Sequence, residues 1–275
     1  MTRQQKFDAF RALHARAGAF VIPNPWDAGT ARILTALGFE ALATTSAGLA
    51  FALGRLDSSA GLTREQVLEN ARSIVEATHL PVSADLEDGF GRAPEKCAET
   101  IWEAATIGLI GGSIEDATGD AEHPIYEFKL AVERVAAAAQ AAGDCQFVLT
   151  ARAENFLWGR PDLADTIKRL QAFAEAGADV LYAPGLPSLD AIREVCASVS
   201  KPVNVVMGLK GASYSVEELA AAGVKRISVG GSFARAALGA FVSAASEVRV
   251  QGTFSYAMGA ISHADVRRFM ESVKR

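Results

Sequence analysis

One arrangement of apolar and polar residues recurs along the chain: an alanine-rich amphipathic segment, a glycine, two or three residues, and a short apolar run. It appears as LTALGFEALATT (34–45), AATIGLIGGSIE (104–115), FAEAGADVLYAP (173–184) and LAAAGVKRISVG (219–230). The glycine stands where a helix end needs a left-handed residue. The apolar run has the length of a strand that is buried on both faces. Each unit therefore predicts a helix, a glycine stop and a parallel strand.

The remaining apolar runs complete a set of eight predicted strands, at residues 19–23, 41–45, 81–85, 111–115, 146–152, 179–184, 202–206 and 226–230. Strict alternation of strands with amphipathic segments predicts a parallel sheet. Eight such units match a closed α/β barrel of the (β/α)8 TIM type. A doubly wound open sheet is the alternative, although no GxGxxG motif follows the first strand as its dinucleotide-binding version would require.

Two further helices are expected outside the repeated units. TRQQKFDAFRALHAR (2–16) predicts an N-terminal helix, and SHADVRRFMESVKR (262–275) predicts a closing helix with Ser262 as its N-cap. No stretch is rich in proline and serine or low in complexity, so no linker is indicated. We therefore expect residues 1–275 to form a single barrel domain with a C-terminal helical extension.

Charge and cysteine content narrow the class of protein. A net charge of -5 and the lack of Lys or Arg runs argue against nucleic-acid binding. No apolar stretch reaches the roughly 18 residues of a membrane span, and the charged N-terminus lacks the apolar core of a signal peptide. Three widely spaced cysteines, Cys97, Cys145 and Cys196, are typical of buried thiols in a reducing compartment. We expect a cytoplasmic protein.

Polar residues lie in the last part of the predicted strands or directly after them, at the end where (β/α)8 barrels carry their chemistry. They are Asn24, Thr44, Thr45, Ser46, Asp85, Glu87, Asp88, Glu115, Asp116, Arg152, Glu154, Tyr182 and Asn204. Several carboxylates with one arginine need a counter-charge, and Mg²⁺ prefers such oxygen ligands. Asp85 and Glu115 end adjacent predicted strands and are the strongest candidates. Glu87 and Asp88 also fit solvated loop charges.

Arg152 ends an otherwise apolar strand within TARAEN (150–155). Its planar guanidinium group suits a substrate carboxylate or phosphoryl group. An internal salt bridge with Glu115 or Glu154 is the alternative, and both interpretations can hold together. Asp27 fits either the site or an N-cap of the next helix. The four histidines lack metal-ligand spacing and are expected on the surface or in the core.

These motifs resemble the isocitrate lyase/phosphoenolpyruvate mutase superfamily. The matching pieces keep their order over residues 19–235: TTSAGLA, LGRLD, SADLEDGFG, SIED, TARAEN and AGADVLYAPG. The resemblance implies Mg²⁺ and a 2-oxo acid or enolate at the barrel mouth, with Asp85, Glu87 and Glu115 around the metal. It implies catalytic roles for Asp57, Glu115 and Arg152. It places the substrate among Thr45, Ser46, Ala47, Asp85, Arg152 and Asn204.

Two features depart from the family pattern. The lyases carry a Lys-Lys/Arg-Cys-Gly-His loop after the fourth strand, whereas EDATGDAEHPIYE (115–127) has neither Cys nor Lys. The mutase-type loop with Lys and Asn is also missing. We therefore expect a Mg²⁺-dependent lyase or decarboxylase acting on a small 2-oxo or 2-hydroxy carboxylic acid through an enolate-type intermediate. Hydrolysis or mutation of a phosphonate C–P bond, and a non-catalytic barrel that binds 2-oxo acids, are the alternatives. Segments 117–127 and 153–162 are expected to set specificity.

The resemblance also bears on assembly. Family members commonly form tetramers that exchange the last barrel helix between neighbouring subunits. Residues 231–260 are rich in small and apolar side chains, which suits a helix packed closely against another subunit. We expect a homo-oligomer, a dimer or tetramer with exchanged C-terminal helices, with an ordinary outer barrel helix as the alternative.

Overall fold

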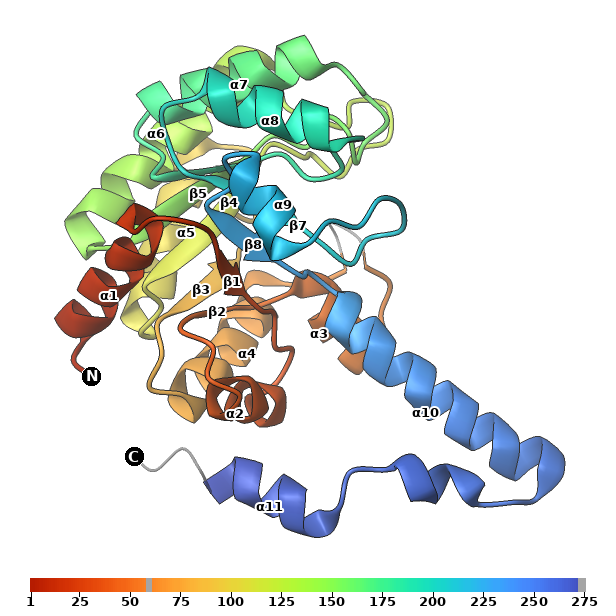
Figure 1. Cartoon of the computed structure of the whole chain (residues 1–275). Coiled ribbons are helices and arrows are strands. Elements are labelled where there is room, and N and C mark those ends of the chain that lie inside the picture. Colours follow the sequence, from red (N-terminus) through yellow and green to blue (C-terminus); the bar gives the residue numbers. More distant parts are fainter. Residues whose placement is uncertain (58–60, 272–275) are drawn as a thin grey trace.

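The strands of the protein form a ring surrounded by helices (Figure 1). The computed structural model describes residues 1–57 and 61–271. Within that part of the chain the eight strands are β1 (Phe20–Ile22), β2 (Leu42–Ala43), β3 (Val82–Asp85), β4 (Gly111–Glu115), β5 (Val148–Arg152), β6 (Val180–Tyr182), β7 (Val203–Val206) and β8 (Arg226–Ser228). All neighbouring pairs are parallel, in the order β1-β8-β7-β6-β5-β4-β3-β2. The backbone N–H of Ala43 donates to the carbonyl of Pro23 at 3.0 Å and brings β2 back to β1. The predicted barrel is confirmed, and the open sheet is excluded.

Helices follow the strands around the outside of the ring. They are α1 (Arg3–Ala15), α2 (Ala28–Ala36), α3 (Ser46–Ala52), α4 (Arg64–Ala77), α5 (Pro94–Thr106), α6 (Phe128–Cys145), α7 (Leu163–Glu175), α8 (Leu189–Ser198), α9 (Val216–Ala221), α10 (Ser232–Gln251), the 3₁₀ helix η1 (Ser255–Gly259) and α11 (His263–Glu271). Short polar side chains cap most of their N-termini. Asp27 is one of these, since its carboxylate accepts the Thr30 N–H at 2.7 Å and thereby starts α2. Its alternative role in the site is therefore not needed.

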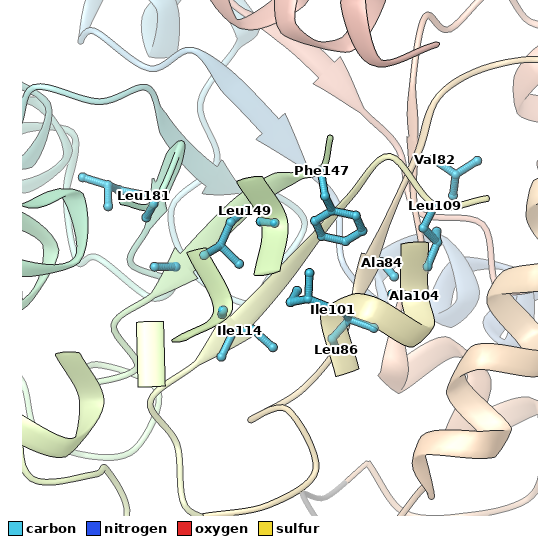
Figure 2. Close-up of a cluster of buried hydrophobic side chains, with 14 of the residues drawn as sticks. Val82, Ala84, Leu86, Ile101, Ala104, Leu109, Ile114, Phe147, Leu149 and Leu181 are labelled. Atoms are coloured by element: carbon cyan, nitrogen blue, oxygen red, sulfur yellow. The ribbon is translucent and has the colours of Figure 1, made fainter. Parts of the chain in front are cut away.

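Alternation along each strand divides the side chains between two environments. Residues that point outward, such as Leu149, Leu181 and Ile114, pack beneath the surrounding helices and form the main apolar core (Figure 2). Residues that point inward fill the ring. Because parallel pairing keeps register, inward residues of neighbouring strands stand side by side. This inner layer carries the polar groups of the candidate site.

Helix α1 closes the N-terminal end of the ring. Phe10 and Leu13 of this helix pack with Phe20, Val148 and other inward apolar residues in a second, smaller cluster. We call this cluster the apolar plug. Gly111 of β4 makes room for it, because a Cβ atom there would lie 2.9 Å from Cε1 of Phe10. With this end filled, only the C-terminal ends of the strands are open to a substrate.

The C-terminal segment leaves the barrel and returns to it. α10 leads away from the ring, and α11 lies near α2 (Figure 1), where Nη1 of Arg32 donates to the carbonyl of Met270 at 2.7 Å. Ser262 accepts the Asp265 N–H at 3.1 Å, which confirms it as the N-cap of the closing helix. Residues 272–275 of that predicted helix lie outside the described residues. None of the described helices has the length and apolar character that crossing a membrane requires.

His14 is buried beside the apolar plug, which agrees with the expectation that the histidines lie on the surface or in the core. Its ring packs edge-on against Phe10 and Phe20, and Nδ1 donates to the carbonyl of Phe10 at 2.8 Å. Burial, followed by the positive charge of Arg226, lowers the pKa of His14 to about 3. An unfolded histidine has a pKa of roughly 6.5. Between these values the unfolded chain binds a proton that the fold excludes, so His14 lowers stability as the pH falls.

Replacing His14 with leucine should therefore flatten the acid dependence of stability. Between pH 7 and about pH 4.5 the wild type should lose about 2 to 3 kcal/mol more unfolding free energy than His14→Leu. Urea unfolding at several pH values measures both curves, and pH 8, where His14 is neutral in both states, supplies the baseline difference. Parallel curves for the two proteins across this range would contradict the assignment.

Candidate active site

A cavity of about 300 Å³ opens at the C-terminal ends of the strands. Its walls include seven of the predicted site residues: Thr45, Ser46, Ala47, Asp57, Asp85, Arg152 and Asn204. Glu115 is not part of the lining but contacts it through Arg152. The predicted specificity segments 117–127 and 153–162 mostly line a neighbouring depression of about 860 Å³, and Leu157 is the residue of these segments that reaches the barrel cavity.

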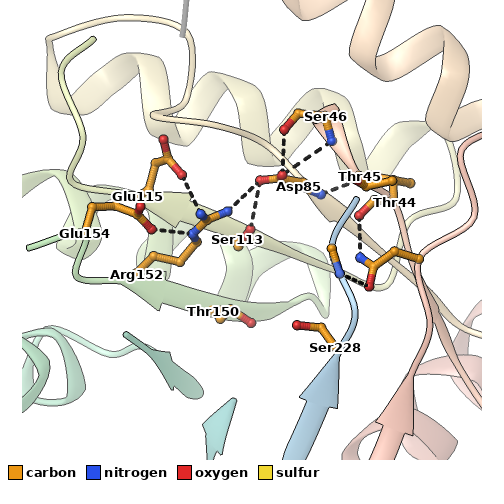
Figure 3. A network of polar contacts seen from close by, with 12 residues as sticks. Thr44, Thr45, Ser46, Asp85, Ser113, Glu115, Thr150, Arg152, Glu154 and Ser228 are labelled. Atoms are coloured by element: carbon orange, nitrogen blue, oxygen red, sulfur yellow. Dashed lines mark hydrogen bonds and ion pairs between the residues drawn. The ribbon is translucent and has the colours of Figure 1, made fainter. Parts of the chain in front are cut away.

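Arg152 lies at the centre of the polar network in this cavity (Figure 3). Its Nη1 contacts Asp85 Oδ1 at 3.0 Å, its Nη2 contacts Glu115 Oε2 at 3.0 Å, and its Nε donates to Glu154 Oε1 at 2.8 Å. Tyr182 places its ring 5.0 Å from the guanidinium carbon. Burial alone would lower the pKa of Arg152, but the carboxylates outweigh it and raise this pKa well above its usual value. The predicted internal salt bridge is therefore present with both expected partners and with Asp85 as a third.

Asp85 is fixed on its other side by the loop after β2. Its Oδ2 accepts the Ser46 hydroxyl at 2.9 Å, and its backbone N–H donates to Thr44 Oγ1 at 3.0 Å. Thr45 caps α3 and so places Ser46 in the first turn of that helix. Gly48 lets this turn lie against the loop after β1, because a Cβ atom would come within 2.8 Å of Trp26 Cβ. The TTSAGLA motif thus positions a hydroxyl group directly on Asp85.

The three carboxylates of the β3 motif point to different places. Glu87 adopts a left-handed backbone, with φ of 51°, and stays near Asp85. Burial and then the Asp85 charge raise the pKa of Glu87 to about 8. Asp88 turns away from the cavity, accepts the Tyr126 hydroxyl at 2.8 Å and lies 3.7 Å from Nη2 of Arg134. Asp88 is therefore a structural anchor for the loop after β3.

Two other acids complete the electrostatics of the site. Burial raises the pKa of Glu115 well above its usual value, although Arg152 opposes this effect. Asp57 is exposed at the rim, where the surrounding protein and then the Asp85 charge raise the pKa of its carboxyl group. The cavity thus holds more acid groups than Arg152 can neutralise, and the acids repel one another.

These carboxylates suit a hard divalent cation that also keeps water or substrate oxygens as ligands. Asp85, Glu87 and Glu115 supply the oxygen atoms that Mg²⁺ prefers, and Mg²⁺ usually retains waters beside one or two protein carboxylates. Among the described residues, no three His, Cys, Asp or Glu side chains are grouped closely enough to hold a metal by themselves. The residues therefore suit an ion bound partly through water and substrate oxygens, with Asp85 as the residue nearest the cavity.

Two more polar residues line the cavity: Asn24, which was expected at a strand end but given no role, and Arg226, which the sequence interpretation overlooked. Asn24 accepts the backbone N–H groups of Val229 and Gly230 at 2.9 and 3.0 Å and donates to the carbonyl of Thr44 at 2.8 Å. Arg226, the first residue of β8, points inward and lines the cavity. The alternation within RISVG is the signal that could have found it, since Arg226 and Ser228 share one side of the strand and Ile227 the other.

Removing the Arg152 charge should cost far more stability than removing a surface charge. Arg152→Met leaves three largely buried carboxylates without their cation, which should lower the unfolding free energy by about 3 to 5 kcal/mol. The matched control is Arg16→Met, because Arg16 pairs with Glu40 at 2.7 Å on the surface and should contribute less than about 1 kcal/mol. Urea unfolding compares the two variants, and equal losses would refute the central role of Arg152.

Comparisons with known proteins agree with this geometry. The family model for phosphoenolpyruvate phosphomutase matches residues 10–249. A 2-methylisocitrate lyase from Shewanella oneidensis is 30% identical over 226 residues, covering 79% of this chain and 76% of that protein. An oxaloacetate decarboxylase from Pseudomonas entomophila is 27% identical over 222 residues, covering 79% and 75%.

Solved structures extend the similarity to the whole fold. A crystal structure from Burkholderia cenocepacia J2315, provisionally described as a lyase/mutase, is 57% identical, has a TM-score of 0.95, and covers 98% of this chain and 96% of its own. A 2,3-dimethylmalate lyase is 25% identical with a TM-score of 0.86, covering 98% and 95%. The family match and the motifs around Arg152 confirm the resemblance seen in the sequence. The chain belongs to the phosphoenolpyruvate phosphomutase family, within the phosphoenolpyruvate mutase/isocitrate lyase superfamily.

Proposed function

We propose that the protein is a Mg²⁺-dependent lyase or decarboxylase that acts on a small 2-oxo or 2-hydroxy carboxylic acid. The bond that breaks is one to the carbon next to the carbonyl of a 2-oxo acid, or the carbon–carbon bond at the hydroxyl carbon of a 2-hydroxy acid. The observation that carries this proposal is the Arg152 network in a cavity at the C-terminal ends of the strands. Such a cavity combines a fixed cation with acid groups that favour a second cation. Cleavage of this kind builds negative charge on an enolate, which fixed positive charges stabilise.

Each predicted site residue except Thr45, which caps α3, has a part in this proposal. Arg152 holds the substrate's oxygen atoms, and Glu115 and Glu154 keep its guanidinium plane in one orientation. Ser46 and Ala47 line the wall beside Asp85, where their N–H groups can receive a carboxylate. Asp57 stands at the rim as an acid–base group, and Asn204 lines the inner wall. Asp85, assisted by Glu87 and Glu115, would hold Mg²⁺, which neutralises charge on the substrate oxygens when it is bound.

The relatives support this class of substrate. Their names refer to 2-methylisocitrate and oxaloacetate, which are both small carboxylic acids. Loop 117–127, which lines the neighbouring depression, lacks the cysteine of the lyase pattern. Decarboxylation of a 2-oxo acid makes smaller demands on that loop, because the enolate that forms can take its proton from water. The decarboxylase form of the reaction is therefore our first expectation.

Turnover with Mg²⁺ tests the proposal. Oxaloacetate, 2-methylisocitrate and phosphonopyruvate are each incubated with the purified protein, and the products are followed by NMR. Release of pyruvate with CO₂ or with succinate supports the proposal, whereas release of pyruvate with phosphate assigns the C–P reaction instead. A protein that binds these acids and turns over none of them would be the non-catalytic barrel.

Asp85→Asn tests the metal assignment within the same experiment. The amide keeps the size of the side chain and removes the charge, so the Mg²⁺ concentration for half-maximal activity should rise at least about tenfold, in line with the loss of a charged ligand. Asp88→Asn is the matched control, because Asp88 faces Tyr126 and Arg134 outside the cavity. Equal Mg²⁺ requirements in wild type and Asp85→Asn would remove Asp85 from the metal site.

The protein is further proposed to assemble as a dimer or tetramer through exchanged C-terminal helices. Among the described residues of α10, Ala234 alone is buried. Large apolar side chains are exposed along this segment: Phe233, Leu238, Phe241, Val242, Val250, Phe254, Tyr256, Met258 and Ile261. A concentration of large exposed apolar side chains in one segment supports an interaction site. A second copy of α10 offers a surface of matching composition.

Light scattering at micromolar concentration tests the assembly. The wild type should give a multiple of 28.9 kDa, and Phe241→Glu should shift the mass toward the monomer, because it buries a charge in the proposed interface. Trp102→Glu on α5 is the matched control, since Trp102 is also an exposed aromatic residue but lies outside the C-terminal segment. A wild-type mass of a monomer would exclude the exchange.

A further inference from the structure

A second arginine lies deeper in the barrel than Arg152. The strand register relates the two: Arg152 pairs with Tyr182, Tyr182 with Asn204, and Asn204 with Arg226. The next pairing, from Arg226 to Phe20, reaches the apolar plug. This row of inward side chains therefore descends from the mouth to the floor, and Arg226 is its last polar member. Its side chain lines the same cavity as Arg152 and is 95% buried.

The surroundings of Arg226 carry no compensating charge. Its Nε donates to Asn204 Oδ1 at 2.8 Å and its Nη2 donates to Thr150 Oγ1 at 2.9 Å, which are both neutral acceptors. Within residues 1–57 and 61–271, its Nη1 has no hydrogen-bond partner and no carboxylate lies within ion-pair distance of the group. Burial lowers the pKa of Arg226 to about 10, so the group still carries its charge near neutral pH. A buried, unpaired cation is costly to the fold and attracts an anion.

Arg152 and Arg226 consequently differ as receptors for an anion. All three nitrogen atoms of Arg152 already face carboxylates within 3.0 Å. A substrate acid group that approaches Arg152 must therefore share it with three acids. An acid group that approaches Arg226 displaces none, and the guanidinium fork suits a planar carboxylate.

We propose that Arg226 binds a second acid group of the substrate, a carboxylate at the inner end of the cavity. This rests on the proposed function and makes Arg226 the residue that selects substrates with two acid groups over those with one. Nη1 is itself buried, so the guanidinium group must turn toward the cavity when the acid group docks. In that movement the hydrogen bonds from Arg226 to Thr150 and Asn204 are either kept or replaced by bonds to the substrate's acid group.

A buried water molecule is the competing account of the same atoms. Nε2 of His14 also has no partner among the described residues, and the Arg226 charge contributes to the low pKa of that histidine. A water between the two groups would satisfy both without any role in binding. That account predicts that Arg226 affects stability and leaves anion affinity unchanged.

Calorimetric titration in Mg²⁺-containing buffer separates the two accounts. Malonate and propionate are the probes, because they have the same number of carbon atoms and differ in one carboxylate. The wild type should bind malonate at least tenfold more tightly than propionate. Arg226→Gln should weaken malonate binding at least tenfold and leave propionate binding within twofold, while Arg226→Lys should fall between. Arg16→Gln, which removes a surface arginine, should behave as the wild type.

Unchanged malonate affinity in Arg226→Gln, or an equal loss for both probes, would overturn the proposal. If Arg226→Gln does not fold, a crystal structure of the wild type with malonate decides: a carboxylate within hydrogen-bond distance of the Arg226 guanidinium group supports the proposal, and malonate bound elsewhere overturns it. The titration measures the affinity of the two probes and does not require the protein to be catalytically active. A negative result here therefore leaves the proposed lyase activity standing, and a failed turnover assay leaves this binding result standing.

Discussion

The structure depends on one guanidinium group that three carboxylates share. Arg152 ends β5, Glu115 ends the adjacent strand β4 and Asp85 ends the next strand, β3, so two of the three contacts join the ends of these three consecutive strands. Without Arg152 these acids would repel one another in a largely buried space. The same arrangement leaves more acid groups than Arg152 can neutralise, since Glu87 and Asp57 lie close by in addition to its three partners. Structural integrity and the attraction for a second cation thus have a common electrostatic origin.

Local backbone geometry decides which acids of the β3 motif join this network. Alternation brings Asp85 inward at the end of its strand. Glu87 remains near it because its backbone turns into the left-handed region directly afterwards. Asp88 then faces outward, where Tyr126 and Arg134 hold it. Acids that are adjacent in sequence therefore serve the cavity and the outer loop separately, and the crowding implied by the sequence is partly relieved.

The sequence predicts the fold more completely than it predicts the site. All eight strands and both terminal helices are present, because alternation and glycine stops depend on local chemistry. The strand predicted at 41–45 ends at Ala43 because the Thr44 side chain accepts the Asp85 N–H and Thr45 caps α3. Asp85, Glu115 and Arg152 were identifiable as strand-end residues. Arg226 begins its strand: alternation within RISVG could have placed its side chain on the inner face, but its position in the cavity follows from the register around the ring. The metal and its ligands stay a prediction.

The join between β1 and β2 has a consequence for dynamics. The neighbouring strands around the ring are linked by ladders, whereas this join relies on the Ala43 N–H to Pro23 bond and on the Asn24 amide, which reaches Thr44 and the end of β8. Among the described residues, this join, the seam of the barrel, has the fewest backbone hydrogen bonds between neighbouring strands, so it should open at the lowest free-energy cost. Its amide hydrogens should therefore exchange with solvent before those of β4 and β5. Thr44 and Asn24 also form the cavity wall. Because Thr44 contacts both the seam and Asp85, opening of the seam would displace a group that holds Asp85. A ligand that rigidifies the cavity would therefore also slow hydrogen exchange at the seam.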